Sequence, residues 1–160
     1  GGTLLILAEQ GLGDEIMFAS CVPDTLRCAS QVIVDCAPRL APIFVRSFPQ
    51  ARVVVGADRS NWGWLSGLPQ PDRAICIGSL PRWFRPDLES FPKTPAYLCA
   101  DSERAAYWRE RLAQQLGEGL KVGICWRSGL RTGERHKYYA TLEDWTPLFA
   151  VPGVHFINLQ

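Results

Sequence analysis

Short apolar runs alternate with amphipathic segments along this chain, a pattern typical of a parallel α/β fold. The apolar runs predict strands at residues 3–8, 31–36, 52–56, 74–77, 121–126 and 154–159. Helical spacing between them predicts helices at residues 14–29, 38–48, 101–116 and 142–150, the first interrupted near Pro23. Repeated prolines predict a loop from Pro81 to Pro95. We therefore expect an α/β fold, a Rossmann-like parallel sheet flanked by helices.

A break at Glu118–Gly119 separates the helix at 101–116 from the strand that follows it. We place a domain junction there, between a first Rossmann-like domain, residues 1–118, and the opening β-α-β of a second, residues 119–160. Both ends of the chain resemble cuts from a longer protein. An incomplete second sheet would leave an exposed strand edge, so we expect a dimer or a domain swap through it.

Composition narrows the class of protein. Hydrophobic residues make up 47% of the chain, enough for a core, and 17 basic residues nearly balance 16 acidic ones. No overall field therefore attracts nucleic acid or an anionic membrane. No apolar run approaches the roughly 20 residues that span a bilayer, and no signal segment opens the chain. We expect a cytoplasmic protein with neither nucleic-acid partners nor a transmembrane segment.

The six cysteines do not form a recognisable framework. No CxxC pair occurs, and both histidines are distant from any cysteine cluster. This spacing favours buried thiols in a reducing compartment over disulfides or a zinc site. We expect no metal ligands.

The segment EQGLGDEI, residues 9–16, carries the first candidate site, because it joins the first strand to the first helix. Gly11 and Gly13 would allow a tight turn and close approach of a ligand to the backbone. Asp14 falls at the helix start, where a carboxylate is favoured electrostatically and can also face a cleft.

Asp14 admits two interpretations. It could only cap the helix, a role worth about 0.5–2 kcal/mol, or it could act as a general base on a substrate hydroxyl. Glu15 is the adjacent alternative, but a helical residue points about 100° away from its neighbour. Glu9 could line the same cleft or pair with an arginine.

The segment after the strand at 121–126 carries the second candidate site. Small, hydroxyl and basic side chains suit a diphosphate, which needs N–H groups, hydroxyls and cations around it. These residues are Arg127, Ser128, Gly129, Arg131, Thr132, Arg135, His136 and Lys137. A solvated basic loop is the alternative. Arg82 and Arg85 could likewise hold an acceptor phosphate or carboxylate, or form surface salt bridges.

Three segments together resemble the heptosyltransferase-like glycosyltransferases. They are GLGDEIMFAS after the first strand, GSLPRWFR after the fourth, and KVGICWRSG at the start of the second domain. They are most similar to the version at the C-terminal end of bacterial tetratricopeptide-repeat proteins. The resemblance covers nearly the whole chain and implies a GT-B architecture. The first domain would then hold the acceptor and the second the nucleotide-sugar.

The resemblance also implies roles for individual residues. Asp14 matches the aspartate that serves as general base in these enzymes. Ser128 and Lys137 would contact the donor phosphates, with Arg127 or Arg131 assisting. The implied reaction transfers a sugar from a nucleotide-sugar co-substrate to a saccharide or protein hydroxyl. It would invert the anomeric carbon, with no cofactor and no metal, and this fragment alone would be inactive.

Two other classes stay open. A nucleotide-dependent oxidoreductase also places a glycine loop after its first strand, and Asp35 ends the second strand where a ribose-binding acid would lie. Against it, Ile16 occupies the third glycine position, where it is expected to crowd the helix against the strand. The remaining alternative is a non-catalytic binding module attached to helical repeats.

Overall fold

The computed structural model describes residues 1–9, 11–56, 62–94, 96–127 and 139–160. They form two compact units, residues 1–102 and residues 103–160. Each unit contains its own parallel sheet. The predicted α/β class with a Rossmann-like parallel sheet flanked by helices is confirmed.

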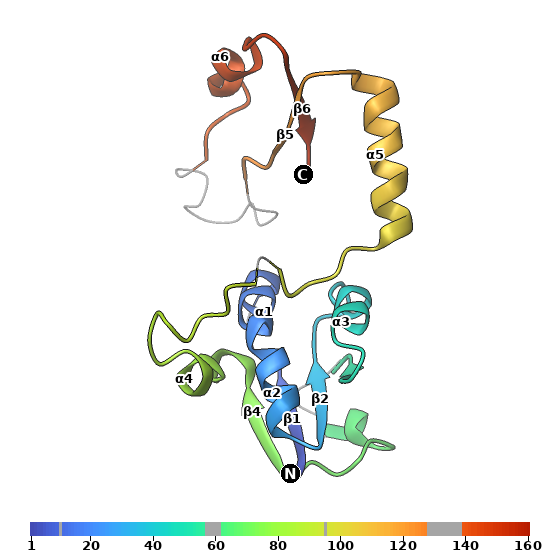
Figure 1. The fold of residues 1–160 in the computed structure, drawn as a ribbon, viewed down its shortest axis with the longest axis vertical. Coiled ribbons are helices and arrows are strands. Elements are labelled where there is room, and N and C mark those ends of the chain that lie inside the picture. The colour runs from blue at the N-terminus through green and yellow to red at the C-terminus, as the bar shows by residue number, and fades with distance from the viewer. Residues whose placement is uncertain (10, 57–61, 95, 128–138) are drawn as a thin grey trace. The chain divides into compact units, whose positions relative to one another are not determined.

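The sheet of the first unit has four parallel strands (Figure 1). They are β1 (Thr3–Leu7), β2 (Gln31–Asp35), β3 (Arg52–Val54) and β4 (Arg73–Cys76). Their order in the sheet is β3-β2-β1-β4, so β1 pairs with β2 on one side and with β4 on the other. The register places Leu5 opposite both Ile33 and Ala74.

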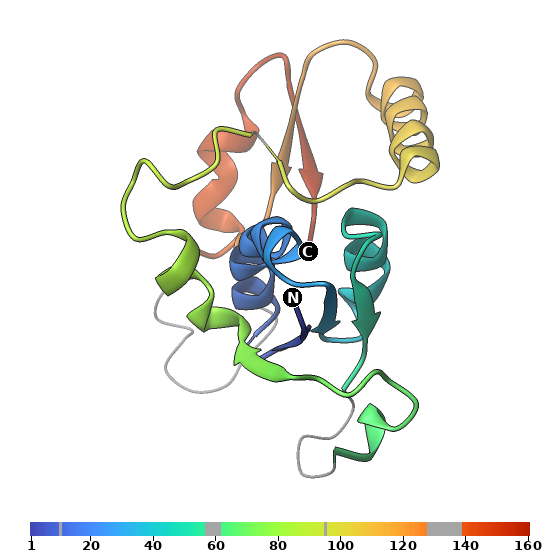
Figure 2. The ribbon, with the colours of Figure 1, turned by 60° about the horizontal axis from the view of Figure 1, so that its bottom comes forward.

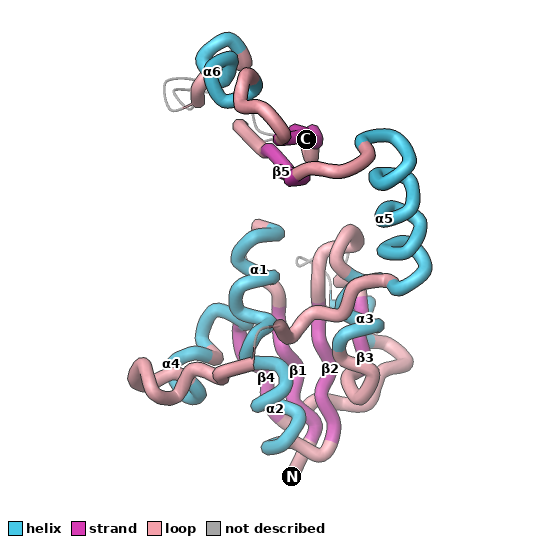
Figure 3. Tube along the Cα trace, turned by 45° about the horizontal axis from the view of Figure 1, so that its top comes forward, coloured by secondary structure: helices cyan, strands magenta, loops and turns pink. Residues whose placement is uncertain are grey.

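Both faces of this sheet are buried at its two central strands, β1 and β2, as expected for parallel strands. Ile6 and Val34 belong to the core shared with the helices, which also contains Phe44 from α3. Leu5 and Ile33 point to the opposite face and are only 2% and 1% exposed. Helices α1 (Leu12–Phe18), α2 (Val22–Cys28) and α3 (Ala41–Ser47) lie together over one face of the sheet (Figure 3).

The predicted helix at 14–29 is two helices. The 3-10 turn η1 (Ala19–Cys21) separates α1 from α2, so the interruption precedes Pro23 rather than falling on it. Proline has no N–H to donate to the carbonyl of Ala19, and its ring would clash with that carbonyl in a continuous helix. Pro23 instead occupies the first turn of α2, which a proline tolerates.

Prolines also shift three other predicted elements. Pro42 lies in the first turn of α3, which therefore starts later than the expected helix at 38–48. The expected loop from Pro81 contains α4 (Pro81–Phe84), preceded by the 3-10 turn η3 (Ile77–Ser79). The expected helix at 142–150 is the 3-10 turn η5 (Glu143–Trp145) followed by α6 (Thr146–Phe149), with a proline in its first turn.

The second unit contains α5 (Ser102–Leu116), β5 (Leu120–Ile124) and β6 (Val154–Asn158). The two strands are parallel and lie side by side, and η5 and α6 fall between them in sequence (Figure 2). These residues therefore form the expected β-α-β unit. Gly119 has φ +119°, and a Cβ there would lie 2.9 Å from the Gly153 carbonyl oxygen, so the turn into β5 requires glycine.

The observed division assigns α5 to the second unit, whereas the predicted domain junction at residues 118/119 follows that helix. The junction of the two Rossmann-like domains stays a prediction, as does pairing through the second sheet. No described helix combines the length and the apolar character that crossing a membrane requires.

Candidate functional site

The strand order creates a topological switch point at the carboxyl edge of the first sheet. From β1 the chain moves outward to β2 and β3, and β4 then joins the opposite side of β1. The segments that follow β1 and β4 are neighbours at this edge, where the Glu9 carboxylate accepts the Gly78 N–H. In open α/β sheets, ligands bind outside the carboxyl ends of the strands at such a switch point. The segment carrying Asp14 lies there, directly after β1.

Asp14 lies in the first turn of α1 and is half-buried. Its Oδ2 accepts a hydrogen bond from the Gly11 N–H at 3.2 Å, and its own N–H donates to the Gly11 carbonyl at 3.0 Å. Asp14 therefore does cap the helix, as the first interpretation holds. Its Oδ1 accepts no hydrogen bond from any described residue, so one carboxylate oxygen is left for a ligand.

The two loop glycines are not required by the turn itself. Gly11 has φ −79°, and Gly13 is not among the described glycines with positive φ. A Cβ built on Gly13 would meet no atom within 4 Å, and one on Gly11 would make ordinary contact with Asp14 at 3.5 Å. The turn-forming explanation for both glycines is therefore wrong. The backbone at Gly13 is instead open to approach from outside.

Two further acids connect the segment after β1 to neighbouring strand ends. Glu15, only 3% exposed, accepts a hydrogen bond from the Ala37 N–H after β2, at 2.9 Å. Glu9 accepts one from the Gly78 N–H after β4, at 3.1 Å. Glu15 therefore fixes the first turn of α1 on the β2 side, and Glu9 connects the two strands that flank the switch point.

Asp35 makes the third connection of this kind. It is 3% exposed and accepts a hydrogen bond from the Gly56 N–H after β3, at 2.7 Å. We call Glu9, Glu15 and Asp35 the bridging carboxylates. The sequence marked all three as candidate ligand groups and did not indicate this structural role. An acid at the carboxyl end of a predicted strand was the signal that could have found this role for Glu9 and Asp35, whereas Glu15 lies inside α1 and carried no such signal.

Two of the bridging carboxylates affect the pKa of the Cys36 thiol. The thiol is 2% exposed, and its pKa is raised from 9.0 to about 12. Burial is the main cause, and the negative charges of Glu15 and Asp35 add to it, because both effects disfavour a thiolate. The thiol is therefore an inert part of the core.

The structure changes both sequence arguments about the oxidoreductase alternative, the one from Ile16 and the one from Asp35. Ile16 is 37% exposed, so it does not crowd α1 against the sheet and that objection is wrong. Its carbonyl accepts a hydrogen bond from the Tyr97 hydroxyl at 2.6 Å. Asp35, however, is buried and bound to the Gly56 N–H, so it is not presented to a ribose.

Arg85 is a structural residue. Its side chain is 4% exposed and donates to Asp24 Oδ2 on α2 at 2.6 Å, and also to the Ser20 carbonyl at 3.2 Å. It is therefore neither a surface salt bridge nor an open anion site. Arg82 is exposed, and its guanidinium lies 6.0 Å from the Trp83 ring centre.

Of the predicted phosphate site, only Arg127 lies in the described part of the chain. Its N–H donates to Gln160 Oε1 at 3.0 Å and its carbonyl accepts from Gln160 Nε2 at 2.9 Å, so Gln160 holds the start of this segment after β5. The guanidinium lies 6.0 Å from the Trp126 ring centre. Ser128, Gly129, Arg131 and Lys137 lie outside the described residues.

The six cysteines are all free thiols. Among the described residues, no group of three or more His, Cys, Asp or Glu side chains is arranged to hold a metal ion.

The chain is similar to one curated protein, Protein FlbA of Caulobacter vibrioides, with 35% identity over 170 residues. The alignment covers 100% of this chain and 28% of FlbA, so the chain spans little more than a quarter of that relative's length. The name FlbA states no activity, substrate or partner. No family model matches the chain, and no solved structure matches it.

Proposed function

We propose that this chain is part of a glycosyltransferase that moves a sugar from a nucleotide-sugar to an acceptor hydroxyl, with Asp14 as the general base. One observation carries the proposal. Of the two adjacent acids after β1, Glu15 is buried and bound to the Ala37 N–H, whereas Asp14 is half-buried and retains an oxygen without a described partner. The accessible acid is the one that the resemblance to heptosyltransferase-like enzymes selects.

The geometry around Asp14 supports this role. A base must reach the proton that it removes, and Asp14 lies at the carboxyl edge of the sheet beside the switch point. Because its Oδ2 accepts the Gly11 N–H, the carboxylate is oriented before a substrate arrives. The open space over Gly13 leaves room for an acceptor next to it.

The proposed donor site belongs to the second unit. Arg127 follows β5, at the carboxyl edge of the second parallel sheet, where phosphates bind in α/β folds. Ser128, Gly129, Arg131 and Lys137 complete this part of the proposal. The proposal also includes inversion at the anomeric carbon and independence from metal. The remaining nucleotide contacts would come from outside this chain, since the proposed whole enzyme is longer.

The test uses the natural protein that contains this chain. A panel of nucleotide-sugars is screened for release of the nucleoside diphosphate or monophosphate, and the responsive donor is then used with Asp14→Asn. Asparagine can still accept the Gly11 N–H, so capping survives while the base is lost. We expect transfer to fall by about 10²–10⁴-fold with an unchanged melting temperature.

Glu89→Gln is the matched control, because Glu89 is exposed and makes no hydrogen bond or ion pair with the described residues. It should transfer at the rate of the natural protein. Transfer by Asp14→Asn at the control rate would remove Asp14 from the mechanism. A protein that releases no nucleotide from any donor would favour the non-catalytic binding module.

A further inference from the structure

Tyr97 connects α1, the helix that carries Asp14, to the segment that leads out of the first unit. Its hydroxyl donates a hydrogen bond to the Ile16 carbonyl at 2.6 Å, across 81 residues of sequence. Ile16 lies in the last turn of α1, where carbonyls have no partner within the helix. The Tyr97 ring is half-buried and packs against the core of the first unit. The bond therefore fixes the end of α1 to a side chain that the core holds in place.

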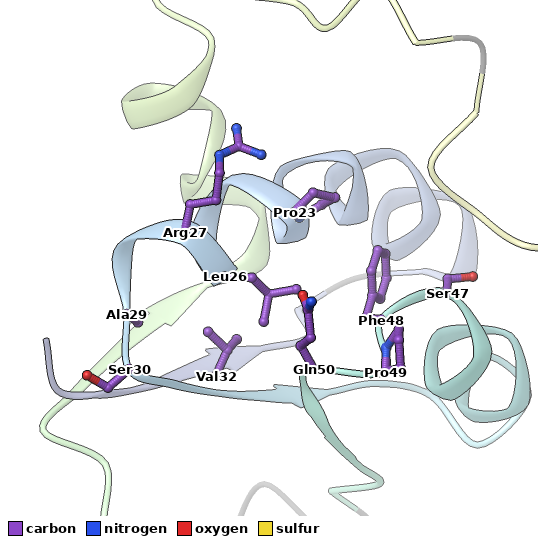
Figure 4. A pocket seen from close by; sticks show the side chains of 10 residues that line it. All are labelled: Pro23, Leu26, Arg27, Ala29, Ser30, Val32, Ser47, Phe48, Pro49 and Gln50. Atoms are coloured by element: carbon purple, nitrogen blue, oxygen red, sulfur yellow. The ribbon is translucent and has the colours of Figure 1, made fainter.

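We call residues 96–101 the exit segment, and α3 holds the rest of it. The Cys99 N–H donates to Ser47 Oγ at 2.8 Å, and Figure 4 shows Ser47 at the end of α3, beside this segment. The Cys99 carbonyl accepts from Arg46 Nε at 2.8 Å, and Arg46 Nη1 lies 3.8 Å from Asp101 Oδ2. Replacing Tyr97 by phenylalanine therefore removes one hydrogen bond from α1 and leaves these contacts in place.

The two ends of α1 are held by different parts of the first unit. Glu15 accepts the Ala37 N–H at 2.9 Å in the first turn, and Tyr97 binds the last turn. An isolated helix of seven residues is unstable in water, so such contacts determine where α1 lies. Burial raises the pKa of the Tyr97 hydroxyl above its ordinary value of 10.0, so the hydroxyl keeps its proton and remains a donor at neutral pH. The direction of the Asp14 carboxylate therefore depends on contacts at both ends of the helix.

We propose that Tyr97 is a positioning residue for Asp14, which holds the end of α1 so that the carboxylate at its start points toward the acceptor hydroxyl. The inference rests on the proposed function, because it takes Asp14 as the base. Tyr97 acts through α1 and not by contact with a substrate, since its hydroxyl is bound to the Ile16 carbonyl. Loss of this hydroxyl should move the carboxylate from its productive direction, and small misplacements of this kind slow the chemical step.

The test uses the natural protein that contains this chain, with the donor to which it responds. Tyr97→Phe should lower kcat by about tenfold and leave the KM for the donor unchanged. Tyr107→Phe is the matched control, because the Tyr107 hydroxyl also takes part in a hydrogen bond, from Arg111 Nη1 at 2.6 Å, but on α5 in the second unit. The control should transfer at the rate of the natural protein. An unchanged kcat in Tyr97→Phe would overturn the proposal.

A double substitution separates positioning of the base from a merely structural role. If Tyr97 acts through Asp14, adding Tyr97→Phe to Asp14→Asn should slow transfer no further, because the base is already absent. Equal fold losses from Tyr97→Phe in the two backgrounds would overturn the proposal.

Hydrogen exchange supplies a readout that does not depend on activity. Amides at the end of α1, such as that of Phe18, should exchange at least about threefold faster in Tyr97→Phe than in Tyr107→Phe. Equal exchange in the two variants would overturn the positioning role in a protein that still transfers sugar, and would leave the proposed function standing. Absence of transfer by the unsubstituted protein from every donor would overturn the proposed function, and the role of Tyr97 with it.

Discussion

Two adjacent acids at the start of α1 have opposite surroundings, and this difference is the basis of the proposed mechanism. Glu15 is 3% exposed and holds the Ala37 N–H, which fixes the first turn of α1 against the loop after β2. Asp14 is half-buried and holds the Gly11 N–H with one oxygen. Fixing the turn through Glu15 therefore also fixes the direction of Asp14. In this arrangement Glu15 positions the turn, and Asp14 keeps one carboxylate oxygen without a partner among the described residues.

Cys36 gives a pH-dependent test of the bridging carboxylates. Its folded pKa of about 12 lies above its ordinary value of 9.0, so the folded state retains a proton that the unfolded chain releases. The resulting stability is fully present below pH 9 and is lost as the pH rises toward 12. We expect the free energy of unfolding to fall over this range by up to about 1.4 kcal/mol per pH unit from this thiol.

Urea unfolding of the natural chain and of Cys36→Ala at a series of alkaline pH values measures this contribution. The free energy of unfolding of Cys36→Ala should depend less steeply on pH than that of the natural chain. Identical slopes would mean that neither burial nor the charges of Glu15 and Asp35 act on this thiol. Cys28, which is exposed, supplies the matched control variant, Cys28→Ala, with an unchanged slope.

At the scale of elements, the strands were predictable and the helix boundaries were not. Each strand is a short, mainly apolar run, and this pattern depends only on local sequence. The helices depend on where a proline can be accommodated. Pro23 and Pro42 each occupy a first turn, so each helix is shorter than its apolar spacing indicates.

The candidate site around Asp14 was predictable only where it depends on local sequence. The position of Asp14 after β1 follows from the strand–loop–helix pattern, and the structure places it there. The bonds from the Gly78 N–H to Glu9 and from the Gly56 N–H to Asp35 join residues at or just beyond the ends of different strands. They depend on the order β3-β2-β1-β4, which local spacing does not specify.

Arg85 connects α4 to α2, and its removal should be costly. The side chain is 4% exposed and pairs with Asp24, which is 18% exposed and keeps Arg27 as a second partner. We expect Arg85→Ala to lower the free energy of unfolding by about 2–3 kcal/mol, below the 3–5 kcal/mol typical of a fully buried pair. Urea denaturation measures this change.

Arg82→Ala is the matched control, since Arg82 is exposed and lies on α4, the short helix that Arg85 directly follows. It should change stability by less than about 0.5 kcal/mol. Equal effects of the two substitutions would mean that the Arg85–Asp24 pair does not hold α4 in place.

At the scale of the whole molecule, the two units differ in how much structure supports them. The first has four paired strands and nearly all of the buried apolar residues of the described chain. The second has two strands, and Ile124 is its one described residue in the buried core. A two-stranded sheet with little buried surface is marginally stable. We therefore expect the two units to unfold separately, the second more readily than the first.

Hydrogen exchange measures this difference directly. Amides of β2 should exchange only on global unfolding of the first unit, whereas those of β5 should exchange at least about 100-fold faster through local opening. Equal protection of the two strands would contradict separate opening and indicate one cooperative unit.

The central claim is that the Asp14 carboxylate removes the acceptor proton, and chemical rescue tests it most directly. In the natural protein that contains this chain, Asp14→Ala should lower transfer by at least about 10²-fold. Added formate, a small carboxylate that can enter the vacated space, should restore part of that rate in proportion to its concentration. It should not accelerate the unsubstituted protein or Glu89→Gln. Transfer by Asp14→Ala at the rate of the unsubstituted protein would contradict the account.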